Sequence, residues 1–298
     1  MSRAVVAVGT PTPAVPLAAA ARAPDSRIAW LGLPLLATLL VVFVLPLIWF
    51  FVRVIGESGG IGAFAELTRH TLSTGAVPQA MVLTLWTSAV VTAATIFVAY
   101  PMAYVLSQAR GLLFSLIILC VVLPYFTSII VRTYAWMVLL GSQGLINKML
   151  LGLGLIGTPL PLLYNTVGVV IGMTYVLLPY MVLTLYAAMR SIDLNLVRAA
   201  FGMGASGAYA FWRVFLPLSM HGVLSGSLIV FILALGFFIT PALMGGPSNI
   251  TIAMLIEREV ELSMNWPVAG AMSLVLLAVT LVLYAVYTRF TDLQRMLR

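Results

Sequence analysis

The chain of 298 residues is 62% hydrophobic and only 8% charged. Soluble domains carry about 25% charged residues, so a soluble fold of this chain would lack a polar shell. The net charge of +7 comes from Lys and Arg residues scattered between apolar stretches, with no basic stripe, which argues against nucleic-acid binding. The composition therefore predicts one domain embedded in a membrane.

Residues 1–27 are rich in Ala and Pro and precede the first long apolar stretch. Ala21-Arg22-Ala23 resembles a signal cleavage site, but no adequate apolar core precedes it, so we expect a disordered cytoplasmic tail here. A transmembrane domain is expected over residues 28–290 and a cytoplasmic C-terminal tail over residues 291–298. Cys120 is the only cysteine, so the sequence offers no intrachain disulfide and no cysteine-based metal site.

Six apolar stretches reach the length of about 20 residues that a helix needs to cross the hydrocarbon core. They cover residues 28–52, 80–106, 112–140, 166–188, 223–244 and 268–287. The sequence thus predicts an all-α polytopic membrane protein. Prolines within these stretches remove backbone donors, and kinks are predicted at Pro46, Pro101, Pro124 and Pro179. Residues 141–164 are rich in Gly and Pro, which predicts a loop rather than a span.

The distribution of basic residues predicts the orientation. With the N-terminus inside, ten basic residues fall in cytoplasmic segments and four in outward segments, so the positive-inside rule places both termini in the cytoplasm. The outward loops are then residues 53–78, 141–163 and 245–266, and the inward loops are residues 107–111 and 189–222. Gly236 makes the outer end of the fifth span easy to break, which suits a gate or an ordinary loop entry.

The inward segment that follows the fourth span has the pattern of two short helices joined by a turn. Asp193 is a plausible N-cap for a helix through Phe201. Gly204 is the position where the chain turns, and we expect it to adopt a positive φ. A second helix begins near Ala208 and leads back to the membrane.

The first of these short helices is expected to present an apolar surface, formed by Leu196, Val197, Ala200, Phe201 and Met203. Such a surface predicts a protein partner. An alternative is a helix that lies on lipid headgroups and is stabilised by Arg190, Arg198 and Arg213. The residues alone leave both interpretations open.

The spacing from residue 198 to residue 217 resembles the coupling loop of permease subunits in binding-protein-dependent ABC importers. That motif is written EAA, three residues, G, nine residues, I, one residue, LP. The matching positions here are Arg198-Ala199-Ala200, Gly204, Val214 and Leu216-Pro217. The resemblance extends from the first span to the last and is to spermidine/putrescine permeases, with further matches at residues 123–136, 160–164, 188–193 and 265–267. Arg198 replaces the usual Glu, so a pairing of that Glu with the ATPase must be absent or rebuilt.

The resemblance implies a type I ABC importer permease with a cytoplasmic coupling helix, in a bacterial inner membrane. It implies a second homologous permease subunit, two ATPase subunits and a periplasmic substrate-binding protein as partners, and a polyamine or a related small organic solute as substrate. The ATPase-coupling residues would be Leu196, Val197, Arg198, Ala199, Ala200, Phe201, Gly204, Ala205, Leu216 and Pro217.

Nucleotide chemistry is expected on another chain. The sequence contains no GxxxxGK[ST] phosphate-binding loop, so we expect ATP and Mg on the partner ATPase and neither a cofactor nor an enzymatic activity on this chain. The alternative function is a secondary, ion-coupled transporter of a small solute. Such a transporter normally shows inverted repeats and intramembrane carboxylates, and this sequence shows neither.

Arg132 is the only charged residue well inside a predicted span, and such residues are commonly functional. It either lines the translocation cavity or binds backbone carbonyls and ties its helix to a neighbour or to the second permease. The structural role is favoured because a bare guanidinium would repel a polyamine cation. Aromatic and hydroxylated residues complete a candidate pathway, although belts at the membrane interface and helix packing are the alternative for most of them. The set is Tyr125, Thr127, Arg132, Tyr134, Trp136, Tyr175, Phe237 and Thr240.

Overall fold

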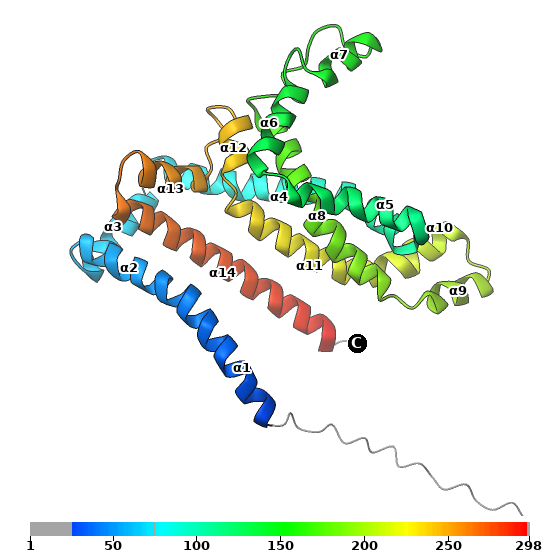
Figure 1. Ribbon diagram of the computed structural model, residues 1–298, viewed down its shortest axis with the longest axis horizontal. Coiled ribbons are helices and arrows are strands. Elements are labelled where there is room, and N and C mark those ends of the chain that lie inside the picture. The colour runs from blue at the N-terminus through cyan, green and yellow to red at the C-terminus, as the bar shows by residue number, and fades with distance from the viewer. Residues whose placement is uncertain (1–25, 74, 297–298) are drawn as a thin grey trace, which may run out of the picture. The chain divides into compact units, whose positions relative to one another are not determined.

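The computed structural model describes residues 26–73 and 75–296 (Figure 1). In this part of the chain the regular elements are all helices, which confirms the all-α prediction. Six candidate membrane spans occur among the described residues, which is the expected number, but the third covers Ile129–Gly152 rather than residues 112–140. Most of the predicted N-terminal tail, residues 1–25, lies outside the described residues, and the first helix begins at Ser26. Contacts divide the chain into two units, Met1–Arg53 and Val54–Arg298.

The first unit is helical throughout its described residues. It contains α1 (Ser26–Leu39), a π-helical turn (Leu40–Val44) and most of α2 (Leu45–Glu57). The N–H of Leu45 donates to the carbonyl of Leu40, five residues earlier. This wider turn immediately precedes Pro46, a residue type that disturbs regular α-helical bonding because it lacks an N–H. The first predicted span is confirmed, with a π-bulge beside Pro46.

Three helices form the packed centre of the second unit: α4 (Ala76–Gln108), α8 (Thr166–Arg190) and α11 (Leu216–Leu235). They run side by side in Figure 1. Their core includes the fully buried side chains of Leu106, Met173, Leu177, Met181 and Leu185. Pro101 and Pro179 lie within uninterrupted α4 and α8.

Glycines let α11 approach α8 closely. A Cβ at Gly226 would lie 2.6 Å from the sulfur of Met181, and a Cβ at Gly222 would overlap the side chain of Ala188. Small residues at such crossings are typical of membrane helices, where close van der Waals contact drives association. This packing fixes the ends of α8 and α11, between which residues 191–215 lie.

The prediction of one continuous helix over residues 112–140 was wrong. The structure has α5 (Gly111–Val122), a 3₁₀ turn (Leu123–Phe126) and then α6 (Ile129–Leu140). The carbonyl of Pro124 accepts both the backbone N–H of Thr127, at 3.2 Å, and its hydroxyl, at 2.8 Å. Because Thr127 is thereby held in extended geometry, the helix cannot continue through it.

The segment predicted as a loop between the third and fourth spans contains a helix, α7 (Leu145–Gly152). Buried Asn147 organises it: its amide donates to the carbonyls of Gly141 and Leu160, both at 3.1 Å, and its side-chain oxygen accepts the N–H of Leu160 at 2.8 Å. The glycines therefore flank a short ordered helix and do not prevent it from forming.

The fifth span begins earlier in the chain than the predicted residue 223. The helix begins with α10 (Gly207–Ala210), passes through a π-helical turn (Phe211–Phe215) into α11 and ends at Leu235. After a break at Gly236, α12 (Ile239–Met244) follows. The start near residue 208 and the break at Gly236 are confirmed, while a gating role for that break stays a prediction.

Shorter and flanking helices complete the second unit. α3 (Ile61–Ser73) and α13 (Ile252–Glu261) occupy segments expected as outward loops, α9 (Leu194–Gly202) lies in the segment expected as an inward loop, and α14 (Trp266–Met296) forms the last span. In Figure 1, α9 and α10 lie at one end of the α4–α8–α11 bundle, and α12 and α13 lie toward the other.

Candidate functional site

The turn between α9 and α10 has the geometry expected from its sequence. The carboxylate of Asp193 accepts the N–H of Asn195 at 2.9 Å and so caps the start of α9. Gly204 has a φ of 85°, which confirms the positive φ expected there. The N–H of Ala205 then returns to the carbonyl of Ala200 at 3.0 Å, closing the end of the helix. Ser206 caps α10.

The exposed apolar surface of α9 is smaller than the one expected from the sequence. Leu196 and Phe201 are about half exposed, and Met203 is 84% exposed. Ala200, however, is only 5% exposed and Val197 packs against the core. The expectation that these two residues face outward was wrong, because α9 packs against α10 and the following π-helical turn.

The remaining predicted coupling residues divide between the surface and the helix start. Arg198 and Ala199 are exposed, and the guanidinium of Arg198 donates to the side-chain oxygen of Asn195 at 3.3 Å. Leu216 and Pro217 begin α11, so the motif ends where the chain enters the central bundle.

An aromatic cluster that sequence reasoning missed links the π-helical turn at Phe211–Phe215 to α4. The ring of Tyr104 lies 5.5 Å from that of Phe211 and 5.1 Å from that of Phe215, both edge-on. These residues also line a cavity of about 380 Å³ beside α9, together with Val197 and Phe201. The i, i+4 spacing of Phe211 and Phe215 was the available signal.

Three of the predicted pathway residues meet in one pocket. Tyr125, Arg132 and Phe237 line a cavity of about 110 Å³ with Tyr180 of α8 and aliphatic side chains. The rings of Tyr125 and Tyr180 are 5.1 Å apart. Within the described residues, Nε of Arg132 is buried and has no hydrogen-bond partner. Tyr180 was missed because nothing in its local sequence distinguishes it from a packing residue.

The other predicted pathway residues lie elsewhere and do not form one wall with this pocket. Trp136 pairs with Tyr175 at 5.4 Å between ring centroids. Thr240 is completely buried, with its hydroxyl 3.4 Å from that of Thr133. The hydroxyl of Thr127 donates to the carbonyl of Pro124 in the turn before α6. Tyr134 is 52% exposed.

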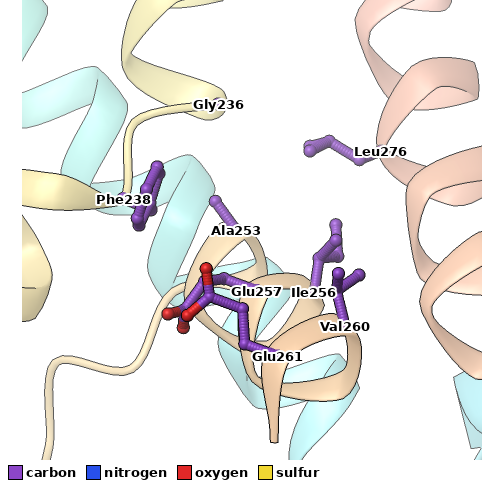
Figure 2. A pocket seen from close by; sticks show the side chains of 8 residues that line it. All are labelled: Gly236, Phe238, Ala253, Ile256, Glu257, Val260, Glu261 and Leu276. Atoms are coloured by element: carbon purple, nitrogen blue, oxygen red, sulfur yellow. The ribbon is translucent and has the colours of Figure 1, made fainter. Parts of the chain in front are cut away.

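Another cavity, of about 330 Å³, lies between α13, α14 and the link after α11. Figure 2 shows the carboxylates of Glu257 and Glu261 side by side below the ring of Phe238, with Leu276 of α14 across the space. Partial burial and the neighbouring Glu261 raise the pKa of Glu257 above its ordinary value. Sequence reasoning placed these residues at the outward rim but did not single out this cavity.

The sequence is similar to known transport proteins. Residues 95–295 match the family described as binding-protein-dependent transport system inner membrane component. The spermidine/putrescine transport system permease protein PotB of Haemophilus influenzae is 35% identical over 206 residues, which cover 69% of this chain and 72% of that protein. The inner membrane ABC transporter permease protein YdcU of Escherichia coli is 33% identical over 221 residues, covering 70% and 68%.

Solved structures show the same fold. One is a chain of a bacterial alginate ABC transporter in complex with alginate pentasaccharide-bound periplasmic protein. It aligns with a TM-score of 0.66 at 20% identity and covers 90% of this chain and 94% of that chain. At this identity the similarity concerns the fold, and it agrees with the helical membrane fold expected from the sequence.

Proposed function

Because this chain belongs to the family of binding-protein-dependent transport system inner membrane components, we propose that it carries a polyamine or a related small organic solute from a periplasmic binding protein to the cytoplasm. The chain is the permease subunit of an ABC importer and has several membrane-spanning helices. Relatives named for spermidine and putrescine transport support the substrate class. The observation that carries the importer assignment is the coupling-loop spacing, realised as a capped helix and a positive-φ glycine.

The transporter contains a second homologous permease and two ATPase subunits, which bind ATP and Mg. The chain sits in the bacterial inner membrane with both termini in the cytoplasm, so α9 faces the ATPases. Leu196, Phe201 and Met203 form its docking surface, since their exposed apolar side chains gain from burial against a partner. A periplasmic binding protein delivers solute at the opposite end, and this membrane subunit binds no nucleic acid.

Movement of α9 reaches the bundle through side chains that pack on its inner face. Ala200 and Val197 hold α9 to its own chain, and the rings of Phe211 and Phe215 contact Tyr104 of α4. Closure of the ATPase dimer therefore displaces α9 together with the ends of α4 and α11 rather than bending a loose loop. The break after Leu235 lets the outer end of the pathway respond separately.

Reconstitution into vesicles tests the proposal. Uptake of labelled putrescine should require ATP in the compartment of the ATPases and the binding protein on the other side. Omission of either is the control and should reduce uptake to background. Uptake that persists without ATP and collapses with an ionophore would instead identify an ion-coupled transporter.

A further inference from the structure

Arg132 lies on α6 without a hydrogen-bond acceptor for its buried Nε in the described chain. A charged group at membrane depth is normally paired. An Nε–H group that is removed from water without an acceptor is costly. The native transporter is therefore expected to supply an acceptor at this position.

This chain has no carboxylate in the helices around the pocket. The lining residues come from the turn before α6, from α6, from α8 and from the end of α11. No acidic residue occurs between Glu66 and Asp193, or between Asp193 and Glu257, so none of these helices offers one. None of the helices that line the pocket supplies a counter-charge.

The pocket has suitable size and donors for one carboxylate. Its volume of about 110 Å³ is a few times the roughly 30 Å³ that a water molecule occupies in the liquid. It therefore has room for a carboxylate group. The planar guanidinium donates in parallel to two carboxylate oxygens, and the hydroxyls of Tyr125 and Tyr180 are further donors.

We propose that the pocket formed by Arg132, Tyr125 and Tyr180 binds one carboxylate group supplied from outside this chain. Two sources share this chemistry: an acidic side chain of the second permease, or a carboxylate on the transported solute. The inference rests on the proposed function for its uptake measurements, but its assembly measurement needs only the isolated complex.

The first experiment tests the second permease as the source. Arg132→Gln should reduce the amount of second permease that co-purifies with this chain by about tenfold, a size in keeping with polar contacts between membrane helices. Each intramembrane Asp or Glu of the second permease is also replaced by Asn or Gln. One of them should reproduce the loss, and combining it with Arg132→Gln should add little further effect.

The matched control is Val131→Gln, which places the same amide on an adjacent residue that is 63% exposed. It should leave assembly unchanged. If Arg132→Gln lowers the abundance of the chain itself, co-purification is measured with Arg132→Lys and Tyr125→Phe instead. Both variants keep a positive charge at residue 132, and each alters the hydrogen-bond donors in the pocket.

The second experiment tests the solute as the source. Uptake of 4-aminobutyrate, which carries one amine and one carboxylate, is compared with that of putrescine, which carries two amines. If the carboxylate comes from the solute, Arg132→Gln should raise the KM for 4-aminobutyrate about tenfold and leave that for putrescine unchanged, with normal assembly.

Wild-type assembly together with wild-type uptake of both solutes in Arg132→Gln would overturn the inference. Failure of the proposed function looks different: the wild-type complex would then show no ATP-dependent uptake of either solute, while the co-purification result would still report whether Arg132 pairs with the second permease.

Discussion

Gly204 connects α9 to α10 through a backbone conformation that side chains with a Cβ rarely adopt. Its φ is 85°, and a Cβ added there would meet no atom within 4 Å. A substitution is therefore strained by the backbone rather than by a clash, by about 1 kcal/mol or more. That strain is too small to unfold the protein but large enough to tilt α9.

Gly204→Val should leave the chain inserted and abundant, while transport falls and the ATPases dissociate or hydrolyse ATP without import. Vesicle uptake and ATPase co-purification measure this. Gly202→Val is the matched control, because Gly202 ends α9 without a positive φ and also has open space around it. Wild-type transport with full ATPase retention in Gly204→Val would show that the turn does not set the coupling surface.

Glu257 gives a prediction on pH. Its pKa is raised from the ordinary 4.5 in the folded protein, so the folded state binds the proton more tightly than the unfolded state. Stability should therefore fall as pH rises from about 4.5 through the raised pKa. Glu257→Gln should remove this loss and be the more stable protein at neutral pH. Thermal unfolding of both proteins in detergent between pH 4 and 8 tests this, and a parallel pH dependence in the two would contradict it.

At the scale of elements, the sequence predicted helices well where apolar residues are continuous and no side chain competes for the backbone. α4 and α8 agree with their predicted spans, and their internal prolines do not break them. The third span failed because hydropathy is continuous across Thr127, whereas two hydrogen bonds from this residue to Pro124 end the helix. Local hydrogen bonding of this kind is invisible to a hydropathy window.

The candidate site was predictable in its capping but not in its packing. Asp193 and Gly204 act through local backbone geometry, which sequence position determines. The burial of Ala200 depends on how α9 packs on the following helix, a tertiary contact that periodicity within α9 alone does not contain. Tyr180 likewise meets Tyr125 only because α8 packs near the turn before α6.

For the whole molecule, the orientation in the membrane is a prediction that labelling tests. With Cys120 replaced by Ser, a cysteine at residue 142 should react with an impermeant reagent from outside intact cells, because the segment after α6 is predicted to be an outward loop. A cysteine at Ser191, in the inward segment, is the matched control and should react only after the membrane is opened. Reaction at Ser142 only from the cytoplasm would invert the topology.

The proposed coupling to ATP requires α9 to contact an ATPase subunit. The most direct measurement attaches a photoreactive benzophenone to Leu196→Cys, in a Cys120→Ser background, within the assembled transporter. Illumination should give an adduct with the ATPase both with and without ATP, because energy transfer needs a contact that persists. The same probe at Val82, an exposed residue of α4, should give none. Adducts with lipid alone at residue 196 would mean that α9 lies on the membrane surface and does not couple this permease to ATP.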